Sequence, residues 1–297
     1  MAAAPPPTTI GPRTFAWGER TFVMGILNAT PDSFSGDGLL ARRDDEADHD
    51  PDDDHAGADH VVRALTRARE MAAEGADLLD IGGESTRPGH DDVPGEDELQ
   101  RVIPVIEALR NALPQMPLTI DTTKPEVAAA ALDAGAHAIN DIWGVSRDDA
   151  LVRLAASRSV PIVLMHNRAE PVYRDVVSEV IADLRGALEK ARHAGVPDEH
   201  VLVDPGIGFG KTAEQNLVLL RDLSRLRELG RPVVLGTSRK STIGKVLDLP
   251  ADERVEGTLA TTALGIAAGV DMVRVHDVRE NVRAARMADA IVRGSAR

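Results

Sequence analysis

Residues 118–141 read Leu118-Thr-Ile-Asp-Thr-Thr-Lys-Pro-Glu-Val-Ala-Ala-Ala-Ala-Leu-Asp-Ala-Gly-Ala-His-Ala-Ile-Asn-Asp141 and contain one complete strand–helix–strand unit. The short apolar run 118–122 is typical of a buried strand. Residues 124–134 then favour a helix, with Pro125 in its first turn and a glycine just after its end, where these residue types are preferred. A second short run, 138–141, completes the unit. We therefore expect a helix that connects two parallel strands.

The same unit recurs along the chain in both directions. Short apolar runs alternate with helical segments, and each unit takes roughly 25 to 40 residues. Eight strands and eight helices in strict alternation predict a (β/α)8 barrel, an α/β fold, with a doubly wound open sheet as the competing arrangement. The predicted strands are 22–28, 78–83, 118–122, 138–141, 161–166, 201–206, 233–238 and 272–276, and the predicted helices are 60–74, 96–113, 124–134, 148–158, 173–194, 213–229, 254–268 and 278–293.

The residues at the strand ends favour the barrel over the open sheet. Almost every predicted strand ends, on its C-terminal side, in side chains that can bind a ligand or take part in catalysis. In a barrel these ends converge on one rim, whereas in an open sheet only the strands near the switch point share a site. The polar residues concerned are Asn28, Glu84, Asp121, Asn140, Asp141, His166, Asp204, Ser238, Arg239, Lys240, Arg274 and His276.

Two segments lie outside the alternation. We expect residues 1–12 to form a disordered tail, followed by a hairpin over 13–21 that turns at Gly18-Glu19 and plugs one end of the barrel. A strongly acidic tract before the first predicted helix cannot be buried and lacks the spacing of an EF-hand, so we interpret residues 40–58 as a solvated, mobile loop. Residues 13–297 are then a single domain.

The composition excludes several classes of protein. The 297 residues contain no cysteine, which excludes disulfides, thiolate metal sites and cysteine nucleophiles. A net charge of -14 argues against broad nucleic-acid binding. The N-terminal sequence lacks the pattern of a signal peptide, and no apolar run approaches the ~20 residues needed to span a bilayer. We therefore expect a cytoplasmic protein that does not bind a membrane.

The acids at the predicted rim include Asp204, which opens the glycine-rich segment Asp204-Pro-Gly-Ile-Gly-Phe-Gly-Lys211. Neither the Walker A pattern nor the dinucleotide fingerprint fits this glycine spacing, so we expect a close backbone approach to a ligand rather than a phosphate cradle. With Asp121 and the amide of Asn140, Asp204 suits a flat heterocycle that presents N–H donors. Taken singly, each aspartate could equally cap a helix or form a structural ion pair.

The other predicted rim residues are cations and hydrogen-bond donors. Arg87, Lys240, Arg274 and His276 suit a phosphate group, for which arginine is the bidentate partner. His166 also ends a strand, and we interpret it as a core histidine whose hydrogen bonds are satisfied.

Eight motifs, one for each predicted strand, resemble those of the dihydropteroate synthase family. They occur in order between about residue 22 and residue 293, and eight in sequence are far more specific than any one of them. The motifs are Gly25-Ile-Leu-Asn-Ala-Thr-Pro-Asp-Ser-Phe-Ser35, Asp80-Ile-Gly-Gly-Glu-Ser-Thr-Arg-Pro-Gly89, Ile120-Asp-Thr-Thr-Lys-Pro125, Ile139-Asn-Asp-Ile142, Leu164-Met-His166, Asp204 to Lys211 as above, Ser238-Arg-Lys-Ser241 and Val273-Arg-Val-His-Asp-Val278.

The resemblance implies a transferase that condenses 6-hydroxymethyl-7,8-dihydropterin diphosphate with 4-aminobenzoate, releases pyrophosphate, requires Mg2+, forms a homodimer and is a target of sulfonamides. It assigns catalytic roles to Asp121, Lys240, Arg274, His276 and Arg87. It implies pterin binding by Asp121, Asn140, Asp204 and Lys240, diphosphate binding by Asn28, Arg87, Arg274 and His276, contact with Mg2+ by Asn28, and aminobenzoate binding by Thr86, Pro88, Phe34, Phe209 and Ser241.

Two other functions fit part of this pattern. A pterin-binding methyltransferase that serves a corrinoid protein would share the acids but has no need of the Arg274 and His276 motif. A catalytically silent pterin-binding protein would be indicated by the loss of a rim residue, and none is lost from the sequence.

Overall fold

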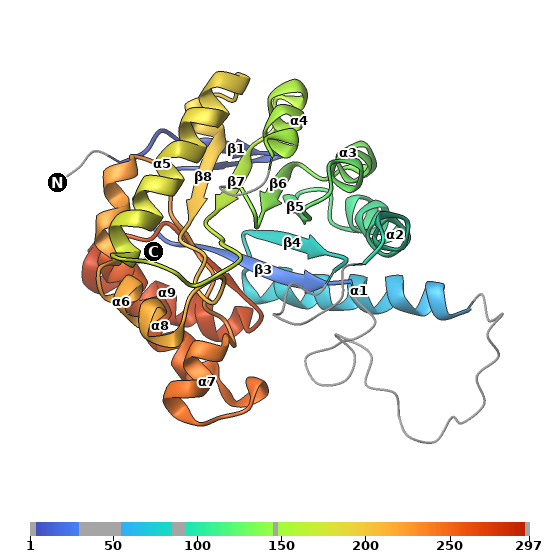
Figure 1. Ribbon diagram of the computed structural model, residues 1–297. Coiled ribbons are helices and arrows are strands. Elements are labelled where there is room, and N and C mark those ends of the chain that lie inside the picture. Colours follow the sequence, from blue (N-terminus) through green and yellow to red (C-terminus); the bar gives the residue numbers. More distant parts are fainter. Residues whose placement is uncertain (1–3, 30–54, 85–92, 145–147, 295–297) are drawn as a thin grey trace.

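Eight parallel strands form the centre of the molecule (Figure 1). The structure is a computed structural model that describes residues 4–29, 55–84, 93–144 and 148–294. The strands follow one another around the sheet in the order β8-β7-β6-β5-β4-β3-β10-β9. Their bounds are β3 Phe22–Asn28, β4 Leu78–Gly82, β5 Leu118–Asp121, β6 Ala138–Asp141, β7 Ile162–Met165, β8 Val201–Asp204, β9 Val234–Leu235 and β10 Met272–Val275.

The two ends of this sheet meet and make a nearly closed barrel. Val203 in β8 forms a parallel bridge with Val233, and its backbone N–H donates to the carbonyl oxygen of Pro232 over 3.0 Å. The predicted (β/α)8 barrel is therefore confirmed, and the open sheet is excluded.

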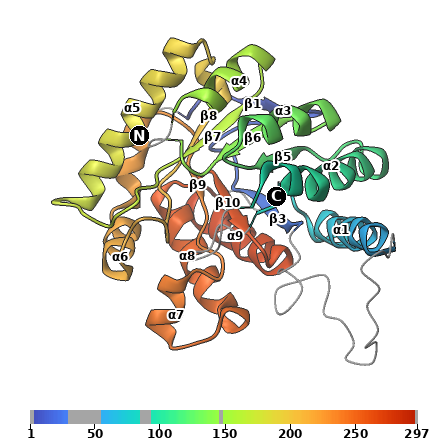
Figure 2. The ribbon, with the colours of Figure 1, turned by 45° about the vertical axis from the view of Figure 1, so that its right-hand side comes forward.

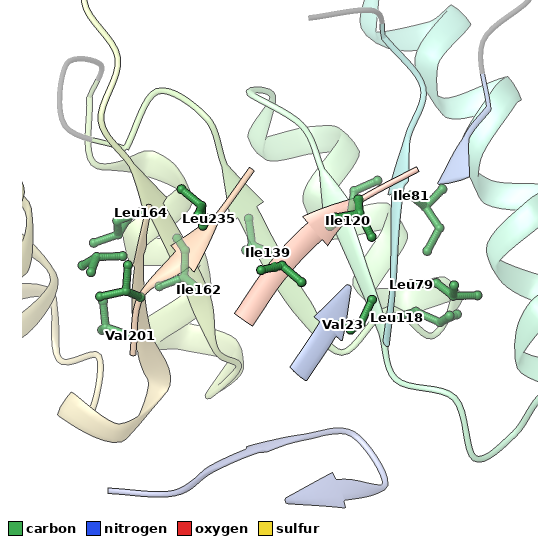
Figure 3. Packing of buried hydrophobic residues seen from close by; sticks show 14 of the residues in the cluster. Val23, Leu79, Ile81, Leu118, Ile120, Ile139, Ile162, Leu164, Val201 and Leu235 are labelled. Carbon is green, nitrogen blue, oxygen red and sulfur yellow. The ribbon is translucent and has the colours of Figure 1, made fainter. Parts of the chain in front are cut away.

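Helices surround the barrel on its outer face (Figure 2). Side chains that alternate along the strands, such as Val23, Ile120 and Leu164, join the buried cluster between strands and helices (Figure 3). No helix in the described residues is long and apolar enough to cross a membrane. The helices are α1 His55–Glu74, α2 Gly95–Ala112, α3 Pro125–Ala134, α4 Ala150–Arg158, α5 Val176–Ala194, α6 Ala213–Arg221, α7 Ser241–Leu247, α8 Val255–Ala268 and α9 Val278–Val292, with 3-10 segments Asp198–His200, Leu223–Leu229 and Ala251–Glu253.

An N-terminal hairpin closes the end of the barrel at which the strands begin. Its strands are β1 Thr8–Ile10 and β2 Arg13–Phe15, and the Thr8 hydroxyl donates to the carbonyl oxygen of Glu199, just before β8, over 2.6 Å. Phe15 and Trp17 are buried in one cluster with residues from the barrel interior. The predicted plug is confirmed, because these aromatic side chains fill the interior below the site.

The predicted bounds of the hairpin are wrong. The chain turns at Gly11, whose φ of 54° favours glycine, and not at Gly18-Glu19. The predicted tail of residues 1–12 therefore extends too far, since it includes β1 and the turn.

Other elements also differ from the prediction, among them β9, which covers Val234–Leu235 and not 233–238. Helix α1 begins at His55, so the end of the predicted loop 40–58 is helical, and residues 40–54 lie outside the described residues. The helix predicted over 213–229 ends as an α-helix at Arg221 and continues as a 3-10 segment. The short helix α7 was not predicted, because seven residues show too little periodicity to be recognised.

Candidate active site

The register of the strands gathers polar side chains inside the C-terminal half of the barrel. Gly82 lies beside Asp121, and Asp121 lies beside Asn140 on the next strand. Met165 lies beside Asp204. Since side chains alternate between the two faces of a strand, the polar residues of β4, β5, β6, β8 and β10 point into one interior space.

Arg274 of β10 reaches across this space to two carboxylates. Its Nε donates to Asp80 Oδ2 over 2.6 Å, and its terminal nitrogen donates to Asp121 Oδ2 over 2.5 Å. Asp80 also accepts hydrogen bonds from Thr119 and, over 3.0 Å, from Asn140 Nδ2. Although burial opposes its charge, Asp80 and Asp121 raise the pKa of Arg274 above its ordinary value. The guanidinium is therefore a fixed cation at the floor of the site.

Asp121 keeps one oxygen free for a ligand. Its Oδ2 is used by Arg274, whereas its Oδ1 is buried and has no hydrogen-bond partner among the described residues. Burial raises the pKa of Asp121 to about 7, because the cost of desolvation outweighs the attraction of Arg274. A buried acceptor without a partner is rare in folded proteins, so this oxygen is positioned for a donor that the protein does not supply.

Asp204 and Lys240 form the second half of the floor. Asp204 Oδ1 accepts the backbone N–H of Gly206 over 2.6 Å, and Lys240 Nζ lies 3.7 Å from the centroid of the Phe209 ring. Burial raises the pKa of Asp204 to about 6 and lowers that of Lys240 to about 7. The two groups can therefore donate and accept along the edge of a flat polar ligand near neutral pH.

The glycines after Asp204 let the chain fold tightly against the end of β7. Gly206 and Gly210 have φ values of 67° and 54°. A Cβ at Gly206 would overlap the carbonyl oxygen of His166, and one at Gly210 would overlap the backbone of Arg168. The close approach that the structure shows is to the chain that follows β7, and the approach to a ligand that the sequence suggests stays a prediction.

We expect Gly206→Ala to abolish ligand binding, because the backbone has to move and Asp204 then loses the N–H donor that orients it. Gly230→Ala is the matched control, since Gly230 has a φ of 64° but no atom within 4 Å of an added Cβ. The control measures left-handed strain alone, about 1 kcal/mol in stability. Calorimetric titration with the pterin that the sequence resemblance implies compares the two variants, and equal affinities would contradict a role of this loop in ligand binding.

On the other side of the site, His276 lies against Ser238. Its backbone N–H and its Nδ1 are 3.1 and 3.0 Å from Ser238 Oγ. Arg239, with a φ of 58°, forms two hydrogen bonds with Asp277 and so fixes the loop after β9 to the start of α9. Burial, together with Arg239 and Arg274, lowers the pKa of His276 to about 3. His276 is therefore a neutral donor at physiological pH.

The comparisons with known proteins agree with this geometry. A sequence profile of the pterin binding enzymes matches residues 24–276. The dihydropteroate synthase of Clostridium beijerinckii is 48% identical over 285 residues, which cover 96% of this chain and 99% of that protein. The chain belongs to the dihydropteroate synthase family. It is a transferase with dihydropteroate synthase activity.

Two solved structures of family members extend the match to three dimensions. Clostridium difficile dihydropteroate synthase, crystallised in the presence of pteroic acid, has a TM-score of 0.85 and 45% identity and covers 94% of this chain and 99% of its own. The Xanthomonas albilineans dihydropteroate synthase with 4-aminobenzoic acid has a TM-score of 0.85 and 41% identity, covering 97% of this chain and 98% of its own.

The structure brings five of the predicted site residues of this family member together. Asp121, Asn140, Asp204, Lys240 and Arg274 share one interior space. Asn28 ends β3, the Phe209 ring lies against the Lys240 ammonium, Ser241 begins α7 and His276 follows β10. The other predicted residues, Phe34, Thr86, Arg87 and Pro88, lie outside the described residues.

Sequence reasoning assigned no role to Asp80 or Lys211. Asp80 is fully buried and accepts hydrogen bonds from three side chains, and its signal was an acid in the middle of an otherwise apolar strand. Lys211 Nζ lies 2.9 Å from His166 Nδ1, a contact across 45 residues that no sequence pattern indicates. His166 is buried with both ring nitrogens in contact, so the interpretation as a core histidine is correct.

The lowered pKa values of His166 and His276, both about 3, predict acid sensitivity. Unfolded histidines bind a proton near pH 6.5, so the unfolded state binds more protons than the folded state between pH 6.5 and 3. The contribution of these two histidines to the free energy of unfolding is fully present above pH 6.5 and falls as pH is lowered through this window, whereas the raised pKa values of Asp121 and Asp204 act in the opposite direction. Urea unfolding of the wild type and of His166→Gln at several pH values isolates the contribution of one histidine. Imidazole NMR signals of either histidine that titrate above pH 5 would contradict it.

Proposed function

We propose that the interior space binds the pterin ring of 6-hydroxymethyl-7,8-dihydropterin diphosphate and that 4-aminobenzoate attacks from the rim. The observation that carries the proposal is the buried Oδ1 of Asp121, which has no hydrogen-bond partner among the described residues. The Asp204 carboxylate is the second acceptor, since both acids interact with the Lys240 and Arg274 cations. A pterin presents ring N–H and amino donors, which these oxygens accept. The amide of Asn140 completes the row of polar groups.

Different residues of the chain then stabilise the two charges that develop during the condensation. Breaking the C–O bond to the diphosphate leaves positive charge on the pterin methylene and negative charge on the leaving group. The Asp121 carboxylate stabilises the positive charge on the methylene. Arg274, with the neutral donor His276, stabilises the negative charge on the diphosphate. The aminobenzoate nitrogen needs no strong base. We assign contact with its ring to Phe209, which lies against Lys240, and to Ser241 at the start of α7.

Asn28 is the residue that we propose for contact with Mg2+. Among the described residues, no group of three or more His, Asp or Glu is arranged to hold a metal ion unaided. Mg2+ commonly uses one or two protein oxygens and takes its other ligands from phosphates and water, so the amide oxygen of Asn28 at the end of β3 fits that mode. When bound, the ion would neutralise charge on the diphosphate.

Pyrophosphate release tests the proposed function directly. Purified protein with Mg2+ and both substrates should release one pyrophosphate for each dihydropteroate formed, and reactions lacking 4-aminobenzoate should give no dihydropteroate. Binding of pterin without release would indicate a silent binding protein. Methyl transfer from a reduced methylpterin to a corrinoid protein would indicate the methyltransferase instead.

A homodimer through the last helices belongs to the same proposal. Leu264 of α8 is 69% exposed, and Met287 and Ile291 of α9 are 63% and 72% exposed. Large exposed apolar side chains on two adjacent helices are typical of an interface. In analytical ultracentrifugation the wild type should sediment as a dimer and Ile291→Glu as a monomer. A wild-type protein that sediments as a monomer would contradict the proposal.

A further inference from the structure

The ammonium group of Lys211 lies inside the glycine-rich loop that follows Asp204. Its Nζ donates to the carbonyl oxygens of Gly206 and Phe209, both over 3.0 Å, and lies 2.9 Å from His166 Nδ1. An ammonium has three donors, and here each has an acceptor. One side chain thus joins both ends of the loop to the end of β7.

These contacts fix the state of His166. The Asp183 carboxylate can only accept, so His166 Nδ1 accepts from Lys211 and the ring proton is on Nε2. That nitrogen lies 3.1 Å from Asp183 Oδ2, and Asp183 is held in turn by Arg168 over 2.7 and 3.0 Å. Lys211 is therefore supported by a chain of partners that extends from the barrel to helix α5.

The loop that Lys211 holds contributes two contacts to the floor of the site. The Gly206 N–H orients the Asp204 carboxylate over 2.6 Å, and the Phe209 ring lies against the Lys240 ammonium. Gly208 also approaches the Lys240 side chain, since an added Cβ would be 3.0 Å from its Cδ. The Lys211 contacts fall on the carbonyl groups of the same two residues, Gly206 and Phe209.

We propose that Lys211 is a positioning residue for the pterin-binding floor, an inference that rests on the proposed function. Lys211 holds the glycine-rich loop so that Asp204 and Lys240 face the ring edge together. It acts through Asp204, and it does not contact the substrate. Without the ammonium, two carbonyl groups and the His166 ring lose their donor, and the left-handed glycine backbone is free to change conformation.

A double-mutant cycle on pterin binding tests this role. The variants are Lys211→Met, Asp204→Asn and both together, and the probe is a pterin whose intrinsic fluorescence is quenched on binding. Lys211→Met should weaken binding at least tenfold in the wild-type background and less than threefold in the Asp204→Asn background. A purely structural role would give the same fold-change in both backgrounds, and that result would overturn the proposal.

The charge of Lys211 is tested by a conservative variant. Lys211→Arg keeps a cation that can donate to several carbonyl oxygens, so it should recover part of the affinity that Lys211→Met loses. It is also the second variant if Lys211→Met fails to fold. An Lys211→Arg protein that folds but binds pterin no better than Lys211→Met would contradict the proposal.

The control is Lys190→Met, which removes an exposed lysine from α5 and should leave affinity unchanged. Failure of the proposed function is distinguishable, because then the wild-type protein itself would not quench pterin fluorescence. If the wild type binds and Lys211→Met binds equally well, only the present inference fails.

Discussion

Arg274→Met should lower kcat/KM by about a thousandfold or more and reduce the free energy of unfolding by about 3 to 5 kcal/mol. The stability loss follows from Asp80, which is fully buried and would lose its only ion-pair partner in the described part of the chain. The activity loss follows from removal of the cation proposed to stabilise the departing diphosphate. Chemical unfolding and steady-state pyrophosphate release measure the two effects.

A second change separates these two effects. Arg274→Met combined with Asp80→Asn replaces the unpaired buried charge with a neutral amide that still accepts from Thr119. This double variant should recover most of the lost stability but none of the lost activity. Recovery of turnover in the double variant would show that Arg274 serves only to neutralise Asp80, which would contradict its assigned role.

The conservative variant Arg274→Lys gives a further control. A lysine keeps the positive charge, but its single nitrogen cannot reproduce the planar fork that reaches Asp80 and Asp121 at once. We therefore expect intermediate stability and strongly reduced turnover.

The barrel could be predicted because its pattern is local. Each strand is a short apolar run, and each helix has its own start and stop signals, such as Pro125 and the left-handed Gly135 of α3. The positions of Asp121 and Asn140 followed from the fold class alone, since parallel strands in a barrel end on one rim.

The contacts within the site could not be predicted in the same way. Arg274 meets Asp80 and Asp121 across 194 and 153 residues, and its choice of partners depends on strand register and on burial. The sequence predicted that Arg274 binds the diphosphate, whereas the structure shows that it also pairs with Asp80 and Asp121. Likewise, the hairpin was placed too late in the chain because Gly18 and Gly11 are equally good turn residues and only packing of Phe15 decides between them.

Asp121→Asn should lower kcat by about a hundredfold to a thousandfold while changing the free energy of unfolding by no more than about 1 kcal/mol. Asparagine keeps the shape and an oxygen for Arg274, so packing is retained. It removes the charge that we propose for stabilising the cationic pterin methylene. Stability is little affected because burial already disfavours the ionised form, as the raised pKa of about 7 indicates.

The pH dependence of kcat/KM tests whether Asp121 is the group whose negative charge is needed for turnover. If the carboxylate is the active form, wild-type kcat/KM rises with pH through about 7 and falls again as Lys240, also near 7, loses its proton. In Asp121→Asn the rising limb should move to about pH 6, where Asp204 ionises, and the falling limb should move to lower pH, because the Asp121 carboxylate raises the pKa of Lys240. A rising limb unchanged by the substitution would show that a different group carries the essential negative charge. Asp121 would then only hold Arg274 in place.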